Sequence, residues 1–238
     1  MHYQNLSIMC VLAFALILGC KGDTTSSTET NSFRKENKPD STDDIILSER
    51  ADSMLLSSDN GPERVIWQKP ELVVNLLGDL KNQTVADIGA GTGFFTFRLL
   101  QKADKVIASD IDTASLHLMQ ILSMKLDTAI SDRLKIVIAK ADDPNLGKDK
   151  VDVAFISNTY MYLTNRGKYL QNLKLYLKPN ARLMIIDYKK KNLPFGPQAS
   201  QKIDLSQVEN ELTDAGFKIL LSDDISLDYQ YIVIATIK

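Results

Sequence analysis

Cysteine and histidine are nearly absent from this chain of 238 residues. Its two cysteines, Cys10 and Cys20, both lie in the first twenty residues, which excludes a disulfide framework and a zinc site built on cysteines. The two histidines, His2 and His117, are too few for a histidine-rich metal site. We therefore expect no bound metal, and we expect His117 to be an exposed or helix-packed side chain without a catalytic role.

An excess of basic charge is also missing. The formal net charge is −2 at pH 7, so the basic surface typical of a nucleic-acid binder is not expected. With 44% hydrophobic and 24% charged residues, the composition is that of an ordinary globular protein. The length suits one domain with an appendage, and we expect a monomer.

The one long apolar run lies at the N-terminus. Residues 6–19, LSIMCVLAFALILG, span about 21 Å as a helix, less than the ~30 Å hydrocarbon core of a bilayer. This length is typical of the central region of a signal peptide. The end of the run, ILGC, resembles a bacterial lipobox in which Cys20 is acylated. We therefore expect a lipoprotein-type signal peptide over residues 1–19 and a lipid anchor in the bacterial cell envelope. An uncleaved anchor or a misassigned start is the alternative, the latter giving a cytoplasmic protein.

A polar segment follows this leader. Residues 21–43 contain nine Ser and Thr, and Phe33 is their only large apolar side chain. Such a segment cannot bury enough apolar surface to offset the entropy cost of ordering, so residues 20–43 are expected to be a disordered tether. Residues 44–66 have some helical spacing of apolar side chains and predict an accessory helical segment.

The remaining residues, 67–238, alternate short β-rich runs with amphipathic stretches. The expected strands are Thr84–Ile88, Lys105–Asp110, Leu134–Ala139, Val151–Ser157, Arg182–Asp187, Phe217–Ser222 and Gln230–Thr236. The expected helices are Phe94–Lys102, Thr113–Ile130, Arg166–Leu177 and Leu205–Ala215, with a turn at Pro179-Asn180. This order predicts an α/β fold, a doubly wound, Rossmann-like, seven-stranded sheet. The loop between the last two strands is too short for a crossover, so the last strand is expected to run antiparallel.

The segment VADIGAGTGFF is the strongest candidate for a ligand-binding site. A strand ends in Asp87, and three alternating glycines, Gly89, Gly91 and Gly93, follow before a helix begins. Such glycines let backbone amides approach a ligand closely. Asp87 would repel a pyrophosphate, and no Lys or Arg lies in residues 84–97 to compensate. S-adenosylmethionine, with its ammonium and sulfonium centres, would be attracted instead. A tight turn without a ligand is the alternative interpretation.

Acidic residues also follow the next two strands. Asp110 lies 21 residues after Gly89, where a carboxylate can accept both ribose hydroxyls of an adenosine. NAD would fit Asp110 equally well. Asp142 and Asp143 follow the third strand, where an acid could accept the adenine amine, although an Asp-Pro turn is as plausible there. These positions predict a ligand that contains adenosine.

Together these segments resemble a class I S-adenosylmethionine-dependent methyltransferase. VADIGAGTGFFTFRLL resembles the first family motif, VIASDID the second, KADDPNL and VDVAFISNTYMYL the third and fourth, and LYLKPNARLMIIDYKK the following strand. The likeness runs from about Trp67 to the C-terminus. Trp67-Gln68-Lys69-Pro70, Gly196-Pro197 and Tyr229-Gln230-Tyr231 resemble a small bacterial branch that is distantly like the quinone-biosynthesis C-methyltransferases.

The resemblance implies a role for particular residues. It implies that S-adenosylmethionine, and the product S-adenosylhomocysteine, are bound by Asp87, Gly89, Ala90, Gly91, Gly93, Asp110, Ile111, Asp142 or Asp143, and Asn158. Asn158 and Thr159 would lie nearest the sulfonium methyl group, and Asn158, Tyr160 and Tyr162 would position the acceptor. Relatives often carry His, or His and an acid, where this chain has Met161 and Tyr162. General-base catalysis through imidazole is therefore not expected.

We accordingly expect a methyltransferase that acts on a small-molecule acceptor. An acidic or soft acceptor, such as a phenol, carboxylate, thiol or arsenite-like oxyanion, needs little help from a base, because alignment supplies most of the catalysis. Lys189-Lys190-Lys191 could attract an anionic substrate or lipid headgroups, or form a solvated loop. The alternatives are a non-catalytic lipoprotein that binds S-adenosylmethionine or S-adenosylhomocysteine and, less consistent with Asp87, a nucleotide-dependent oxidoreductase.

Overall fold

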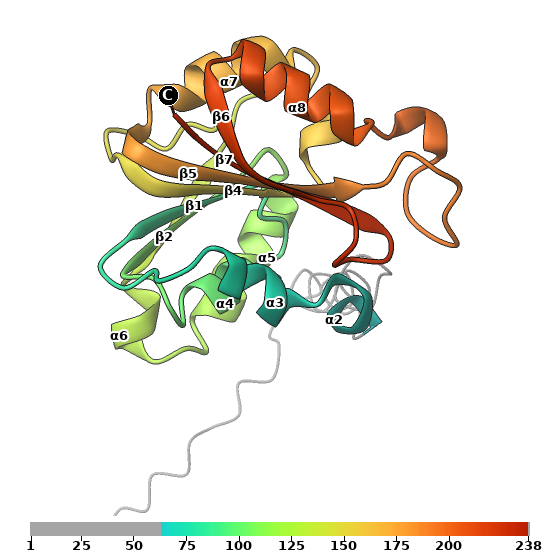
Figure 1. Ribbon diagram of the computed structural model, residues 1–238. Helices are drawn as coiled ribbons and strands as arrows, with labels where there is room; N and C mark the ends of the chain where they lie inside the picture. The colour runs from blue at the N-terminus through green and yellow to red at the C-terminus, as the bar shows by residue number, and fades with distance from the viewer. Residues whose placement is uncertain (1–62, 238) are drawn as a thin grey trace, which may run out of the picture. The chain divides into compact units, whose positions relative to one another are not determined.

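The computed structural model describes residues 63–237 (Figure 1). The predicted signal peptide, the acylation site at Cys20, the tether and residues 44–62 lie outside the described residues. The elements follow one another as α2 (Glu63–Gln68), α3 (Pro70–Leu76), β1 (Thr84–Ile88), α4 (Thr96–Leu99), β2 (Lys105–Asp110), α5 (Thr113–Ser123), α6 (Thr128–Ser131), β3 (Leu134–Ile138), β4 (Val151–Ser157), η1 (Tyr160–Tyr162), α7 (Arg166–Lys174), β5 (Leu177–Tyr188), η2 (Ala199–Gln201), α8 (Leu205–Asp214), β6 (Phe217–Asp223) and β7 (Gln230–Ile237). Within residues 63–237, none of these helices is long and apolar enough to cross a membrane.

The strands form one seven-stranded sheet in the order β3-β2-β1-β4-β5-β7-β6. Strands β1 to β5 run parallel, whereas β7 is antiparallel to both β5 and β6. This confirms the predicted fold class and the reversed last strand. The strand order changes direction between β1 and β4, which places the loops after these two strands on either side of a crevice.

Helices cover both faces of the sheet, as Figure 1 shows with α7 and α8 on one face and α3 and α4 on the other. Successive strand residues point to opposite faces. The side packed with α3 and α4 includes Val85, Val106, Val153, Phe155, Met184, Ile186, Ile232 and Ile234. The side packed with α7 and α8 includes Ala86, Ile88, Ile107, Ala154, Ile156, Leu183, Ile185 and Val233. Burial on both faces explains why the strands are continuous apolar runs in the sequence.

Several predicted boundaries were wrong. The helix expected at Phe94–Lys102 is only α4, and the helix expected at Thr113–Ile130 is divided into α5 and α6. The division occurs because the carboxylate of Asp127 accepts the backbone N–H of Ala129 at 2.9 Å and caps a new helix. The predicted turn at Pro179-Asn180 lies inside β5, which begins at Leu177. The register with β4 shifts there, so the expected turn is an irregularity of a longer strand.

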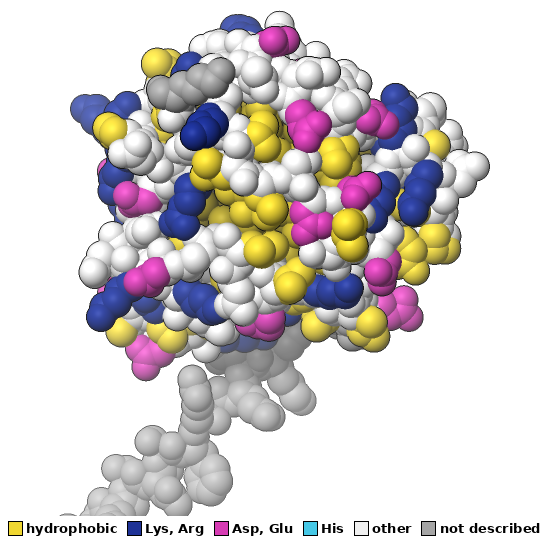
Figure 2. Space-filling view, viewed as in Figure 1, with side chains coloured by type: hydrophobic (Ala, Val, Ile, Leu, Met, Phe, Trp, Pro, Cys, Tyr) yellow, Lys and Arg dark blue, Asp and Glu magenta, His cyan; other side chains and the backbone are white. Residues whose placement is uncertain are grey.

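Charged side chains of both signs are mixed on the face of the molecule that Figure 2 shows. On the face in Figure 2, hydrophobic side chains gather toward the middle, and Lys, Arg, Asp and Glu side chains surround them. This distribution agrees with the nearly balanced formal charge of the chain, which has 28 Lys and Arg against 30 Asp and Glu.

Candidate functional site

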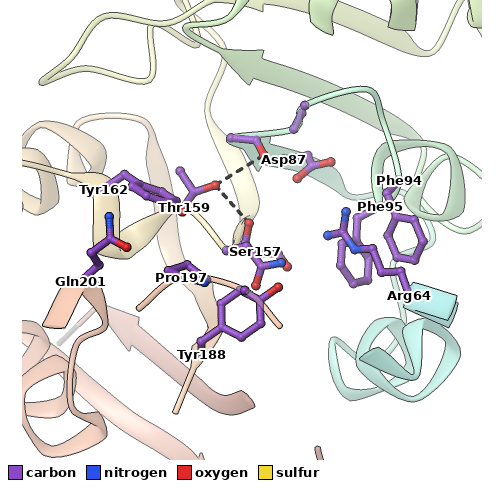
Figure 3. A pocket seen from close by; sticks show the side chains of 15 residues that line it. Arg64, Asp87, Phe94, Phe95, Ser157, Thr159, Tyr162, Tyr188, Pro197 and Gln201 are labelled. Atoms are coloured by element: carbon purple, nitrogen blue, oxygen red, sulfur yellow. Dashed lines mark hydrogen bonds between the residues drawn. The ribbon is translucent and has the colours of Figure 1, made fainter. Parts of the chain in front are cut away.

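A pocket of about 430 Å³ opens at the carboxyl ends of β1 and β4, where the strand order changes direction. Its lining comes from the glycine loop after β1, the segment after β4, the segment after β5, and α2. Figure 3 shows Arg64, Phe94 and Phe95 on one side of it and Thr159, Pro197 and Gln201 on the other. This size and position are typical of sites for small molecules in doubly wound folds.

The glycine loop approaches the pocket with its backbone. Gly89 has a φ of +72°, and a Cβ added there would lie 2.0 Å from Thr159 Oγ1. Gly91 has a φ of +55°, and nothing lies within 4 Å of where its Cβ would be. The backbone N–H of Gly91 donates to Asp110 Oδ2 at 2.7 Å, so the acid that ends β2 holds the loop in place. The space beside Gly91 is therefore open, and Gly91 lines the pocket.

Asp87 lies at the end of β1, buried under the glycine loop. Its carboxylate accepts a hydrogen bond from the Thr96 hydroxyl at 2.6 Å. Burial raises the pKa of Asp87 to about 6, while the Thr96 hydrogen bond and the positive charge of Arg64 oppose the rise. A cationic ligand group beside this carboxylate would stabilise its ionised form.

Arg64 brings a positive charge into the same pocket from α2. The side chain is only 8% exposed, and its guanidinium carbon lies 4.0 Å from the centre of the Phe94 ring. Its Nε donates to Gln68 Oε1, one helical turn further along α2. Arg64 precedes Asp87 by 23 residues and belongs to no glycine-loop pattern, so sequence reasoning missed it. Among the lining residues, Asp87 and Arg64 are the charged pair, and together they complement a zwitterion.

The segment after β4 forms the other wall of the pocket. Asn158 has a left-handed backbone, with a φ of +55°, which asparagine tolerates better than most residues. Its backbone N–H donates to the carbonyl oxygen of Ile186 at 2.8 Å, and its Oδ1 accepts from Gln230 Nε2. Thr159 Oγ1 donates to the carbonyl oxygen of Ser157 at 3.0 Å and lies 3.5 Å from that of Gly89, as the dashed lines in Figure 3 show. These contacts fix the direction of the Asn158 and Thr159 side chains.

The structure brings some of the predicted site residues to the pocket and leaves others outside its lining. Asp87, Gly89, Ala90, Gly91, Asn158 and Tyr162 line it. Asp142 instead forms an ion pair with Lys168 at 2.5 Å, and Asp143 accepts a hydrogen bond from the Tyr176 hydroxyl at 2.8 Å. Their roles toward adenine stay predictions.

Gly93, Asp110, Ile111 and Tyr160 also lie outside the pocket lining. Gly93 packs instead against Phe97, where a Cβ would lie 2.6 Å from the ring. The Ile111 side chain is exposed. The Tyr160 hydroxyl donates to Glu211 Oε2 at 2.8 Å on α8, and burial raises the pKa of this phenol. Tyr160 therefore holds η1 against α8, while its neighbour Tyr162 faces the pocket.

A second buried carboxylate, Asp187, lies under η1 at the end of β5. It accepts the backbone N–H groups of Met161 and Tyr188, each at 3.0 Å. Burial raises the pKa of Asp187 to about 7. No sequence motif predicts this role of Asp187, which is to anchor the segment that carries Tyr162.

The lysines after β5 line a different hollow. Lys189, Lys190 and Lys191 share a pocket of about 450 Å³ with Asp204, Glu209 and Asp224, so acids offset their charge. Lys189 Nζ donates to the carbonyl oxygen of Asp224. Within residues 63–237, no three His, Cys, Asp or Glu side chains lie close enough together to hold a metal ion.

The seven-stranded sheet, with β7 antiparallel between β5 and β6 and a glycine loop at the change in strand order, has the fold of a class I S-adenosylmethionine-dependent methyltransferase. Residues 79–229 match a family model described as a methyltransferase domain, and the chain belongs to this family. A solved S-adenosylmethionine-dependent methyltransferase from Aquifex aeolicus is similar over 80% of this chain and 98% of that one, with 26% identity and a TM-score of 0.71. These findings confirm the resemblance drawn from the motifs.

Two further proteins match a smaller share of this chain. The glycopeptide N-methyltransferase MtfA, solved with S-adenosylmethionine, has a TM-score of 0.60 over 71% of this chain and 93% of that one, and its 15% identity shows the fold alone. The ubiquinone/menaquinone biosynthesis C-methyltransferase UbiE of Vibrio vulnificus is 27% identical over 128 residues, 52% of this chain and 48% of that protein. The chain thus spans about half the length of the curated relatives it matches first.

Proposed function

We propose that this protein transfers the methyl group of S-adenosylmethionine to a small-molecule acceptor. The cofactor supplies an electrophilic methyl group on a sulfonium; the carbon–sulfur bond breaks with its electron pair left on sulfur, giving S-adenosylhomocysteine. The acceptor's lone pair forms the new bond to carbon, and a proton carried by the attacking atom passes to solvent. The observation that carries the proposal is the pairing of Asp87 and Arg64 beside the open space at Gly91.

The two charges have separate tasks in this proposal. The ionised Asp87 accepts a hydrogen bond from the ammonium group of the methionine part. Arg64 donates a hydrogen bond to the carboxylate of the same methionine part. The backbone at Gly91 lies close to this zwitterion because no side chain fills the space there. Asp110, which already accepts the Gly91 N–H, adds a carboxylate at the loop for the ribose hydroxyls.

Asn158 and Tyr162 position the acceptor, because both line the pocket on the side of the segment after β4. No histidine of the described residues lines the pocket, so residues 63–237 offer no imidazole there as a general base. Catalysis then rests on alignment of the acceptor with the methyl group, which suits an acceptor that is already ionised or soft.

We also infer, on the sequence alone, that residues 1–19 direct export and that acylated Cys20 tethers the domain to the cell envelope through residues 20–43. Residues 44–66 precede the methyltransferase domain as a helical segment in this proposal. The mature protein is a monomer with a membrane anchor and no nucleic-acid partner. A Cys20→Ser variant should lose the lipid and fractionate away from membranes. If it is processed and fractionates as the wild type does, the anchor proposal fails.

Calorimetric titration of the full-length protein, stripped of bound ligand, tests the central proposal. We expect micromolar binding of S-adenosylmethionine and S-adenosylhomocysteine and no binding of NADH. Binding of S-adenosylhomocysteine without the methyl donor would favour a non-catalytic binding protein, the alternative suggested by the missing imidazole. Failure of both to bind would overturn the proposal.

A further inference from the structure

Four polar side chains form a line of hydrogen bonds from α2 to the acceptor side of the pocket. Arg64 Nε donates to Gln68 Oε1, and Gln68 Nε2 donates to Gln230 Oε1 at 3.0 Å. Gln230 Nε2 in turn donates to Asn158 Oδ1. Both glutamines are fully buried, with 0% of their surface exposed. The line joins α2, β7 and the segment after β4, which are far apart in the sequence.

Arg64, at the start of this line, decides which end of each amide donates and which accepts. A guanidinium has only N–H donors, so Gln68 must present its oxygen to Arg64 and its NH₂ to the next side chain. Gln230 then accepts with its oxygen and donates with its NH₂. Reversing either glutamine would bring two oxygens or two NH₂ groups together in a buried place, which is unfavourable.

The consequence falls on Asn158, the last member. Its oxygen is occupied by Gln230, so its Nδ2–H₂ group is the part of the amide left for the pocket that Asn158 lines. The second hydrogen bond of Gln68, to Ser157 Oγ at 3.0 Å, ties the line to the end of β4 directly before Asn158. The left-handed backbone of Asn158 and its N–H bond to Ile186 hold the side chain from the other end.

We propose that Gln68 and Gln230 are positioning residues that hold Asn158 as a hydrogen-bond donor toward the acceptor, so that the acceptor presents an oxygen, as a phenolate, carboxylate or carbonyl, and not an ammonium group. The inference rests on the proposed function and adds the chemical class of the acceptor.

Binding of two matched probes, benzoate and benzylamine, to the full-length protein saturated with S-adenosylhomocysteine tests the proposal by ligand-observed NMR. The wild type should bind benzoate at least fivefold more tightly than benzylamine. Asn158→Asp replaces the donor by a charged acceptor, so it should reverse this preference. Gln230→Met should reduce the preference because it frees the Asn158 amide to rotate. Gln171→Met is the matched control on α7. Gln171 is exposed, donates a hydrogen bond to the carbonyl oxygen of Ala215 at 3.5 Å and does not line the pocket, so this variant should keep the wild-type preference.

Equal binding of the two probes by the wild type, or an unchanged preference in Asn158→Asp, would overturn the proposal. A tenfold loss of S-adenosylhomocysteine affinity in Asn158→Asp with no change in preference would assign the amide to the cofactor instead. Should Gln230→Met fail to fold, Asn158→Asp decides the question. A second measurement needs no cofactor: in the free protein, hydrogen exchange should be fast at the Asn158 side-chain amide and slow at those of Gln68 and Gln230. Slow exchange at Asn158 would refute the assigned direction even if the proposed function failed.

Discussion

Thr159 lies directly against Gly89, so closely that a Cβ on Gly89 would come within 2.0 Å of Thr159 Oγ1. The two residues are 70 positions apart, one after β1 and the other after β4. Their contact joins the two loops at the change in strand order, and both residues line the pocket. Gly89 is required there both for space and for its φ of +72°.

Replacing Gly89 by Ala should therefore damage the site. The added methyl group must displace Thr159 and adopt a backbone conformation unfavourable for an L-residue, so we expect at least a tenfold loss of affinity for S-adenosylhomocysteine and a loss of about 2 kcal/mol or more in unfolding free energy. Calorimetry and denaturant unfolding measure the two effects. Gly167→Ala on α7 is the control, because nothing lies within 4 Å of its Cβ position, and it should be neutral or stabilising. Wild-type affinity in Gly89→Ala would show that the close contact between Gly89 and Thr159 does not shape the ligand site.

Arg64→Met should weaken binding of the amino-acid part of the cofactor and leave binding of its nucleoside part unchanged. Loss of a charge-assisted hydrogen bond to the methionine carboxylate should lower the affinity for S-adenosylhomocysteine about tenfold, or about 1.4 kcal/mol. The affinity for 5′-methylthioadenosine, which lacks the amino-acid part, should not change. Arg98→Met is a matched control, because Arg98 lies 4.1 Å from the same Phe94 ring without lining the pocket. Equal losses of affinity for the two ligands would show that Arg64 does not bind the methionine carboxylate.

Cofactor binding should depend on pH through Asp87. The free protein holds the pKa of Asp87 at about 6, and only the ionised form attracts an ammonium. As pH falls below about 6 the carboxyl is protonated before binding, so the affinity for S-adenosylhomocysteine should fall by up to tenfold per pH unit. Titrations from pH 5 to pH 8 test this. Asp87→Asn should bind weakly at all these pH values, and an equally steep profile in that variant would rule out Asp87 as the group responsible.

Asp187 should lower stability at neutral and higher pH. Its pKa rises from 3.8 to about 7 on folding, so the folded state favours the protonated form. The contribution of the protonated Asp187 carboxyl to the unfolding free energy is fully present below about pH 4 and is lost as pH rises through about 7. Compared with Asp187→Asn, the wild type should lose unfolding free energy over this window, on the order of 2–4 kcal/mol. Urea unfolding at several pH values measures the difference, and parallel curves would show that the carboxyl does not titrate as described.

Tyr160→Phe should separate a structural role from a catalytic one. The variant removes the hydrogen bond to Glu211, which Arg166 also contacts through two nitrogens, at 2.7 and 2.8 Å. We expect a loss of about 1–2 kcal/mol in unfolding free energy, because Glu211 keeps its other partners, and no change in affinity for S-adenosylhomocysteine. A variant with wild-type stability but altered ligand binding would show that Tyr160 has a role in the pocket.

The strands were the most predictable part of this protein. Thr84–Ile88, Lys105–Asp110 and Val151–Ser157 begin and end as the sequence predicts, because apolar runs buried on both faces are bounded by polar residues. Helix limits were predicted less well. Asp127 starts a new helix within an apparently continuous apolar pattern, and Pro179 lies within a strand because β5 is irregular there.

The class of the protein could be predicted from local motifs in the chain, and so could the position of Asp87 and the glycine loop in the lining of the pocket. Asp87 and the glycines that follow are local in the chain, and both their spacing and their backbone requirements can be read from it. The residues on the other sides of the pocket depend on tertiary packing. Arg64, Gln68 and Gln230 come from α2 and β7, and no pattern along the chain links them to Asn158. Contacts between distant segments depend on how the helices and strands pack, and for that reason the direction of the Asn158 amide emerged from the folded chain alone.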